Sequence, residues 1–281
     1  MPRRTVKLKG GAADLISAFD VKLGRFEHSG HQYRGRTGAI YLPADLAPHI
    51  EVVLGLDDRP QATPQFRVRP RASASNISYT PRQVAELYQF PLDADGTGQT
   101  VGILELGGGY KTADLQGYFS SLGLPVPDVI AVLVDGAKNP PSNANSADGE
   151  VLLDIEVVGA VAPRAKIVVY FATNTSQGFQ DALTTAIHDT THHTSVISIS
   201  WGGAESTWTA QAMTAFDSAA QDAAALGVTI CATSGDDGSS DGVDDGKNHV
   251  DFPIVEPAHS RVRGNELAEL WRADFERNGV E

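Results

Sequence analysis

Five short apolar runs, separated by stretches with helical spacing, constrain the fold of this 281-residue chain more than any other feature. The runs lie at 100–106, 129–134, 166–172, 195–201 and 227–233. They are almost continuously apolar rather than alternating, which is typical of strands covered on both faces of a parallel sheet. Helices are predicted between them, at 112–122, 149–161, 176–190 and 207–226, and Gly227 is expected to end the last one. The pattern therefore predicts an α/β fold, a parallel sheet with helices on both faces.

The first part of the chain has a different pattern, which predicts a small α+β unit. Strands are expected at 5–8 and 38–42, and helices at 12–19 and from Pro43 towards Leu54. The segment 59–75 that follows mixes three prolines with arginines and small polar residues, a composition that resists both helix and strand pairing. We interpret it as an exposed basic linker, which is either a plain connection or a cleavage site.

The sign of the charge changes along the chain and supports a division into three regions. Residues 1–71 hold 12 Lys and Arg against 7 Asp and Glu, whereas residues 72–253 hold 6 against 22. Residues 254–281 form a charged amphipathic tail with apolar residues at helical spacing, namely Leu267, Leu270, Trp271 and Phe275. An acidic region of this size repels phosphate backbones, so nucleic acid is an unfavourable partner, and we expect the basic first region to bind the acidic second one.

The single cysteine and the apolar segments argue against a disulfide, a membrane span and a signal peptide in this chain. Cys231 is the single cysteine, so an intramolecular disulfide is impossible, and its apolar surroundings predict a buried thiol. No apolar run approaches the roughly 20 residues that a membrane span needs. The start, MPRRTVKLKGG, has basic residues without an apolar segment after them, so we expect neither a signal peptide nor a membrane anchor in this chain.

Two acidic residues four positions apart form the most informative local feature. Glu150 and Asp154 fall on one face of a predicted helix that is otherwise apolar between them. If they are desolvated, their mutual repulsion makes them titrate as a coupled pair in which one proton is held to a higher pH than normal, an arrangement suited to general acid–base catalysis. The alternative is a solvated helix surface, but the apolar neighbours favour burial of at least one carboxylate.

Two further candidates follow predicted strands, where ligands bind in open α/β sheets. Asp236 comes directly after the run 227–233, and its alternative role is an Asx turn or a helix cap. Trp201 ends the run 195–201 and is followed by two glycines that allow close backbone approach, but a tryptophan there is more often part of the core.

Other motifs are too incomplete to predict a cofactor. Gly107-Gly108-Gly109 lacks the spacing of a nucleotide-binding loop, and His188 and His192 lack the glutamate of a zinc-binding helix. The acidic loop does not follow the EF-hand pattern, so a solvated loop is favoured over a calcium site; it contains Asp237, Asp241, Asp244 and Asp245. No metal ligand set is predicted.

Taken in order, three motifs resemble the sedolisins, the serine-carboxyl peptidases. They are Gly149-Glu150-x-x-x-Asp154-Ile155-Glu156, Ser198-Ile199-Ser200-Trp201-Gly202 and Ser234-Gly235-Asp236. The likeness runs from about residue 76 to 253, and residues 4–66 resemble the later part of the family's activation propeptide. The resemblance implies a subtilisin-like fold, with residues 1–71 as propeptide remnant and basic linker, 72–253 as a partial peptidase domain and 254–281 outside the family pattern.

The resemblance also implies a role for each motif residue. Glu150 corresponds to the general base, Asp154 to its partner, and Asp236 to the oxyanion-hole residue, while Glu105 and Trp201 match a supporting network. An aspartic acid donates a hydrogen bond only when protonated, so an acidic working pH is expected. The family's substrates are peptides and proteins, its own propeptide is a partner, and its members are extracellular and hold calcium in a C-terminal site.

One departure changes the expected activity. The family's nucleophile lies in a Gly-Thr-Ser motif, and this chain contains none, so no nucleophile is identified and the calcium site is expected to be absent. We therefore expect that this polypeptide alone does not cleave peptides by the family mechanism. The alternative is a non-catalytic protein that binds peptides or regulates, and in both cases low pH is expected to weaken the attraction between the basic and acidic regions.

Overall fold

The five predicted strands form one parallel sheet. The computed structural model describes residues 5–28, 30–65, 79–91, 93–142 and 147–253. Its strand order is β5-β6-β4-β7-β9, and every neighbouring pair is parallel. The strands are β4 (Thr100–Glu105), β5 (Val129–Leu133), β6 (Lys166–Phe171), β7 (Val196–Ile199) and β9 (Thr229–Ala232). The predicted α/β class is therefore confirmed.

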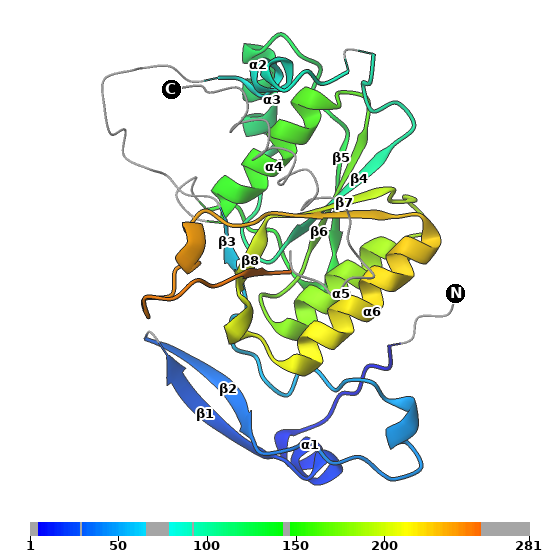
Figure 1. Cartoon of the computed structure of the whole chain (residues 1–281). Coiled ribbons are helices and arrows are strands. Elements are labelled where there is room, and N and C mark those ends of the chain that lie inside the picture. Colours follow the sequence, from blue (N-terminus) through cyan, green and yellow to red (C-terminus); the bar gives the residue numbers. More distant parts are fainter. Residues whose placement is uncertain (1–4, 29, 66–78, 92, 143–146, 254–281) are drawn as a thin grey trace.

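Helices cover both faces of this sheet, as predicted (Figure 1). One face carries α3 (Thr112–Ser121) and α4 (Asp148–Val161), and the other carries α5 (Ser176–Ile187) and α6 (Ala210–Leu226). Each face has its own buried apolar cluster; one is built around Phe119, Val151 and Ile155, and the other around Phe179, Leu183 and Phe216. Gly227 has a φ of 74° and ends α6, where a left-handed conformation favours glycine. A further helix that the sequence did not reveal, α2 (Pro81–Leu87), contacts α4.

The N-terminal unit contains one helix and one hairpin. Helix α1 (Ala12–Phe19) matches its prediction, and the antiparallel pair β1 (Lys22–His28) and β2 (His31–Thr37) follows it. The predicted strands at 5–8 and 38–42 are wrong, and the predicted helix from Pro43 is reduced to one 3-10 turn, η1 (Ala47–His49). The hairpin escaped prediction because its strands carry many charged and exposed side chains, so no apolar run marks them.

The predicted strand 195–201 divides in two. Strand β7 ends at Ile199, and β8 (Trp201–Ala204) leaves the parallel sheet to become the centre of a small antiparallel sheet. Its neighbours are β10 (Asp251–Phe252) and β3 (Thr63–Pro64). The predicted exposed linker is therefore wrong at its start, because Gln61, Ala62 and Gln65 are buried against the rest of the molecule. Residues 66–78 and the predicted tail 254–281 lie outside the described residues.

The predicted burial of Cys231 is also wrong, because the cysteine is exposed. Strand β9 is the edge of the parallel sheet, and α6 packs against it on one face. Since side chains alternate along a strand, Ile230 joins the apolar cluster under α6 while Cys231 points to the other face. On that face α4 contacts β4 and β6, nearer the middle of the sheet. Within the described ranges, no helix is long and apolar enough to cross a membrane.

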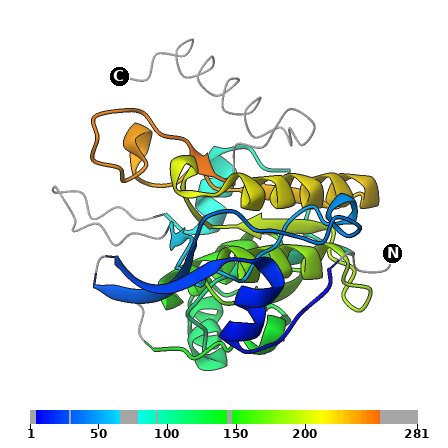
Figure 2. The same ribbon diagram turned by 90° about the horizontal axis from the view of Figure 1, so that it is seen from below.

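Both views place the N-terminal unit beside α5 and α6 (Figure 1, Figure 2). Polar contacts join it to the larger part. The Lys7 ammonium forms ion pairs with Asp135 and, at 3.4 Å, with Asp181 on α5. The side-chain oxygen of Asn174 accepts from the backbone amides of Gln61 and Ala62, both at 3.0 Å. The N-terminal unit therefore lies on the larger part through hydrogen bonds and charges, although its own apolar cluster is separate.

Candidate active site

Three carboxyl groups gather at the carboxyl edge of the parallel sheet. Glu105 ends β4, and Glu150 and Asp154 belong to the first turns of α4. Glu105 is 0% exposed and Glu150 is 2% exposed. The charges that act on Glu105 come from Asp154 and Glu150, so the three groups share one electrostatic site. The prediction that at least one acid of the 150/154 pair is buried is confirmed.

Glu105 is held by Trp201 and is the most strongly perturbed acid of the site. The indole Nε1 of Trp201 donates to Glu105 Oε2 over 2.8 Å, while Oε1 is buried without a partner among the described residues. Burial raises the pKa of Glu105 well above its ordinary value, and the negative charge of Asp154 adds to this, whereas the Trp201 hydrogen bond opposes it. Glu105 therefore retains its proton at pH values where an exposed glutamate is ionised.

Asp154 accepts a hydrogen bond from the serine that follows β7. The Oγ of Ser200 donates to Asp154 Oδ1 over 3.0 Å. Burial raises the pKa of Asp154 to about 6, and the bond from Ser200 opposes this rise. Ser200 comes directly before Trp201, so two adjacent residues hold two acids of the site. The motif Ser200-Trp201 is thus a structural unit, although the sequence alone gave Ser200 no role.

Asp148, at the first position of α4, was missed by the sequence analysis. Its side chain is 3% exposed and accepts from the backbone amide of Gly109 over 2.8 Å and from that of Ser142. These bonds tie the glycine-rich loop after β4 to the helix that carries Glu150. A Cβ at Gly108, whose φ is 69°, would lie 2.6 Å from the backbone of Ala147, so a glycine is required for this approach. An acidic residue in the first turn of a helix was the available signal.

Asp236 is exposed in the loop after β9. Strand β9 ends at the same carboxyl edge as β4 and β7, because the three strands are parallel neighbours. The structure thus brings together Glu105, Glu150, Asp154 and Trp201, whereas a joint role of Asp236 with them stays a prediction.

An extended segment of the chain itself runs beside this site. Thr63 and Pro64 of β3 pair with Gly202 and Trp201 of β8, and the amide of Gln65 donates to the carbonyl of Ser200 over 3.0 Å. Strand β8, the centre of the small antiparallel sheet, therefore holds an extended segment of the chain along one side by backbone hydrogen bonds.

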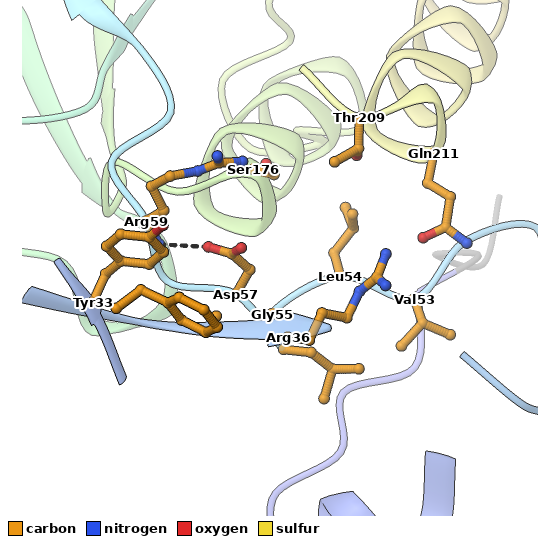
Figure 3. Close-up of a pocket in the computed structure, with 13 residues that line it drawn as sticks. Tyr33, Arg36, Val53, Leu54, Gly55, Asp57, Arg59, Ser176, Thr209 and Gln211 are labelled. Atoms are coloured by element: carbon orange, nitrogen blue, oxygen red, sulfur yellow. Dashed lines mark hydrogen bonds between the residues drawn. The ribbon is translucent and has the colours of Figure 1, made fainter. Parts of the chain in front are cut away.

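A cavity of about 280 Å³ lies elsewhere, between the N-terminal unit and the starts of α5 and α6. Figure 3 shows Tyr33, Arg36 and Asp57 on one side and Ser176 and Gln211 on the other. None of the site acids lines it. In the part of the chain that the structure describes, no group of three His, Cys, Asp or Glu residues could hold a metal ion, so these residues do not fit the calcium that the resemblance implies.

Known proteins share sequence with both parts of this chain. Residues 2–59 match the family model for the activation domain of pro-kumamolisin, and residues 136–255 match the model for the subtilase family. Kumamolisin of Bacillus sp. (strain MN-32) is 51% identical over 263 residues, which are 90% of this chain and 48% of that protein. Sedolisin of Pseudomonas sp. (strain 101) is 26% identical over 281 residues, covering 94% of this chain and 48% of that protein.

The fold has a solved counterpart in Pseudomonas sedolisin, a serine-carboxyl proteinase, complexed with two molecules of pseudo-iodotyrostatin. That structure matches with a TM-score of 0.56 and 24% identity, over 66% of this chain and 53% of the other, and it supports the subtilisin-like fold. The chain spans about half the length of the curated relatives it matches. The ordered motifs, the two family models and the likeness to kumamolisin lead to one conclusion: this chain belongs to the sedolisin family.

Proposed function

We propose that this chain carries the general base, its supporting acids and the oxyanion-hole residue of an acid-acting serine-carboxyl endopeptidase site. Glu150 acts as the general base and Asp154 supports it, while Glu105 and Trp201 extend the network. Asp236, when protonated, donates to the oxyanion. The observation that carries the proposal is the burial of Glu105 and Glu150, next to Asp154, at the carboxyl edge of a parallel sheet. Burying several acids is unfavourable unless they serve a purpose such as proton transfer.

The raised pKa values in the site favour catalysis below neutral pH. Burial raises the pKa of Asp154 to about 6, and burial and the neighbouring charges raise that of Glu105 well above normal. Below these pKa values the network holds protons that it can donate or pass on, whereas above them it accumulates negative charge in a buried place. When this network works together with a nucleophile, peptidase activity is therefore expected to decline as the pH rises through about 6.

The proposed substrate is a peptide or protein that binds as a strand along β8. Residues 63–65 occupy that edge, which fits a propeptide whose connection lies at the site. In this proposal the N-terminal unit is the chain's own partner and is released as carboxylates become protonated. Neither nucleic acid nor a membrane is a proposed partner, an extracellular location follows the family, and calcium has no role that the described residues provide.

A peptide-binding or regulatory role without cleavage is the alternative. It is favoured by the pairing of β3 with β8, which holds an extended segment through the backbone alone, and by the sequence, which has no Gly-Thr-Ser motif. The nucleophile is therefore unassigned, and we expect no turnover from these 281 residues alone.

Hydrolysis of a peptide mixture between about pH 3 and pH 7 separates the two roles. The purified chain is assayed beside Glu150→Ala, Ser200→Ala and a matched control, Glu156→Ala, on the same helix. Acid activity that is lost in Glu150→Ala and kept in Glu156→Ala supports the peptidase. Its loss in Ser200→Ala would show that the network needs the hydrogen bond from Ser200 to Asp154. A folded chain that binds peptides but cleaves none at any pH supports the alternative. Activity that survives Glu150→Ala would contradict the role proposed for Glu150.

A further inference from the structure

The carboxyl group of Asp251 fills a junction of three segments next to the candidate site. Asp251 is 4% exposed, and its Oδ2 accepts from the side-chain amide of Gln65 over 2.9 Å. On β8, a Cβ at Gly202 would collide with Asp251 Oδ1. On the loop after β9, a Cβ at Gly235 would lie 3.0 Å from Asp251 Oδ2. The junction thus joins the segment that ends at Gln65, strand β8, and the turn that contains Gly235 and Asp236.

A second acid, Asp241, reaches the same junction from further along the loop. Its side chain is hydrogen-bonded to that of Asp251, and its Oδ1 would lie 3.3 Å from a Cβ at Gly235. Two carboxyl groups can form such a bond only if one of them carries a proton, because ionised carboxylates are acceptors only. The outer oxygens, Asp251 Oδ1 and Asp241 Oδ2, are buried without a partner among the described residues. The prediction that this acidic loop is simply solvated is therefore wrong for Asp241.

We propose that Asp241 and Asp251 are positioning residues that share one proton, and that this shared proton holds the Gly235–Asp236 turn against β8 and Gln65. The inference rests on the proposed function in one respect, which is the role of Asp236. A group that donates to a developing oxyanion acts only from a fixed position. Asp236 directly follows Gly235, which lies against both acids, so the pair fixes the backbone from which Asp236 projects.

The charged groups around the pair give the arrangement a pH dependence. Burial raises the pKa of Asp251 to about 7, and the charges of Asp241 and Asp237 add to it. His249 also acts on Asp241 and is paired with Asp245, whereas β8 and β3 contribute no titratable side chain. Because the pKa is raised, the stabilisation is present at acid pH and is lost as the pH rises through about 7, when two negative charges face each other.

Hydrogen exchange of the whole chain without substrate tests the proposal. Protection of residues 233–242 is measured by mass spectrometry at about pH 5 and about pH 9, after correction for the intrinsic pH dependence of exchange. The wild type is expected to lose about ten- to a hundredfold protection at the higher pH, since the pair is then fully ionised. In Asp241→Asn the amide donates to Asp251 permanently, so protection is expected to stay the same at both pH values.

Three further variants assign the cause. Asp244→Asn, an exposed residue of the same loop, is expected to behave as the wild type. His249→Gln should also keep the pH-dependent loss, although a histidine can change charge in this range. Asp241→Ala removes the bond and is expected to leave the turn unprotected at both pH values. The proposal is overturned if Asp241→Asn keeps the wild-type loss, if the wild type shows none, or if His249→Gln abolishes it. No hydrolysis enters the measurement, so failure of the peptidase proposal is seen separately.

Discussion

The N-terminal unit, residues 5–60, and the larger part, residues 79–253, are stabilised in different ways. Because the larger part contains the match to the subtilase family, it is called the peptidase part below, after its relatives. The first has one small cluster in which Phe19, Val21 and Leu56 are buried. The second has a large cluster on each face of its sheet. A unit of this size with so few buried side chains is marginal by itself. The peptidase part therefore supplies its own stability, whereas the N-terminal unit depends on polar contacts with its neighbour.

Of the substitutions considered, the largest loss of stability is expected for a core side chain of the peptidase part. Phe216 is 3% exposed, and its ring centroid lies 4.8 Å from Phe179 and 5.3 Å from Phe252. Phe216→Ala should lower the free energy of unfolding by about 3–5 kcal/mol, because it leaves a cavity. Phe26→Ala in the exposed hairpin, where the ring stacks on Tyr33, should cost about 1 kcal/mol or less. Urea unfolding followed by circular dichroism measures both, and similar losses would contradict the comparison.

The stability of the peptidase part is also expected to depend on pH. Burial raises the pKa values of Glu105, Asp154 and Asp251 in the peptidase part, so the folded state binds more protons than the unfolded chain between about pH 4 and pH 7. Stability is therefore expected to be highest at acid pH and to fall as the pH rises through this range. Melting temperatures measured across the range check this, and Glu105→Gln should make the curve flatter. A wild-type curve that rises with pH would refute the assignment.

The contact at Asn174 is expected to have an intermediate effect, confined to the segment that joins the two parts. Asn174→Ala leaves the amides of Gln61 and Ala62 without their acceptor, which should make local opening easier by about 1–3 kcal/mol. Hydrogen exchange of residues 61–65 measures the change, and the exposed Asn248→Ala is the matched control. Equal exchange in the two variants would show that other contacts hold the segment.

The smallest change in free energy is expected for substitution of Lys7, which helps to attach the N-terminal unit. Its ion pairs with Asp135 and Asp181 are partly exposed, so Lys7→Ala should weaken the attachment of the N-terminal unit by about 1 kcal/mol or less. The wild type should also lose this contribution in high salt. Limited proteolysis of the N-terminal unit at low and high salt measures both, with the exposed Lys9→Ala as control. A loss that is insensitive to salt would mean that Lys7 acts through packing.

The sequence predicted the peptidase part far better than the N-terminal unit, for a physical reason. Strands buried on both faces are marked by continuous apolar runs, and these located all five strands of the parallel sheet. The hairpin β1–β2 has few buried side chains, so no such pattern exists. At Ser200 the chain leaves the parallel sheet for the antiparallel one, but the apolar run continues across this bend. The sequence therefore predicted one strand where the structure has β7 and β8.

The candidate site was predictable where the chemistry is local and unpredictable where distant segments meet. Glu150 and Asp154 are four residues apart on one helix, so their spacing placed them together. The hydrogen bonds from Ser200 to Asp154 and from Gln65 to Asp251 join residues far apart in the sequence, and no sequence motif reveals such contacts. The roles given to Glu105, Trp201 and Asp236 came from the family resemblance rather than from spacing.

The exposed thiol of Cys231 provides a built-in reporter for one face of the sheet. The chain has a single cysteine, so a thiol-reactive dye attaches at one site, on edge strand β9. Partial burial raises the pKa of this thiol, so labelling should be faster in mildly alkaline buffer, where more thiolate forms. A peptide or polypeptide that binds to this face is expected to slow labelling of Cys231 or to change the emission of the attached dye. Binding to this face can then be followed in real time without adding a residue.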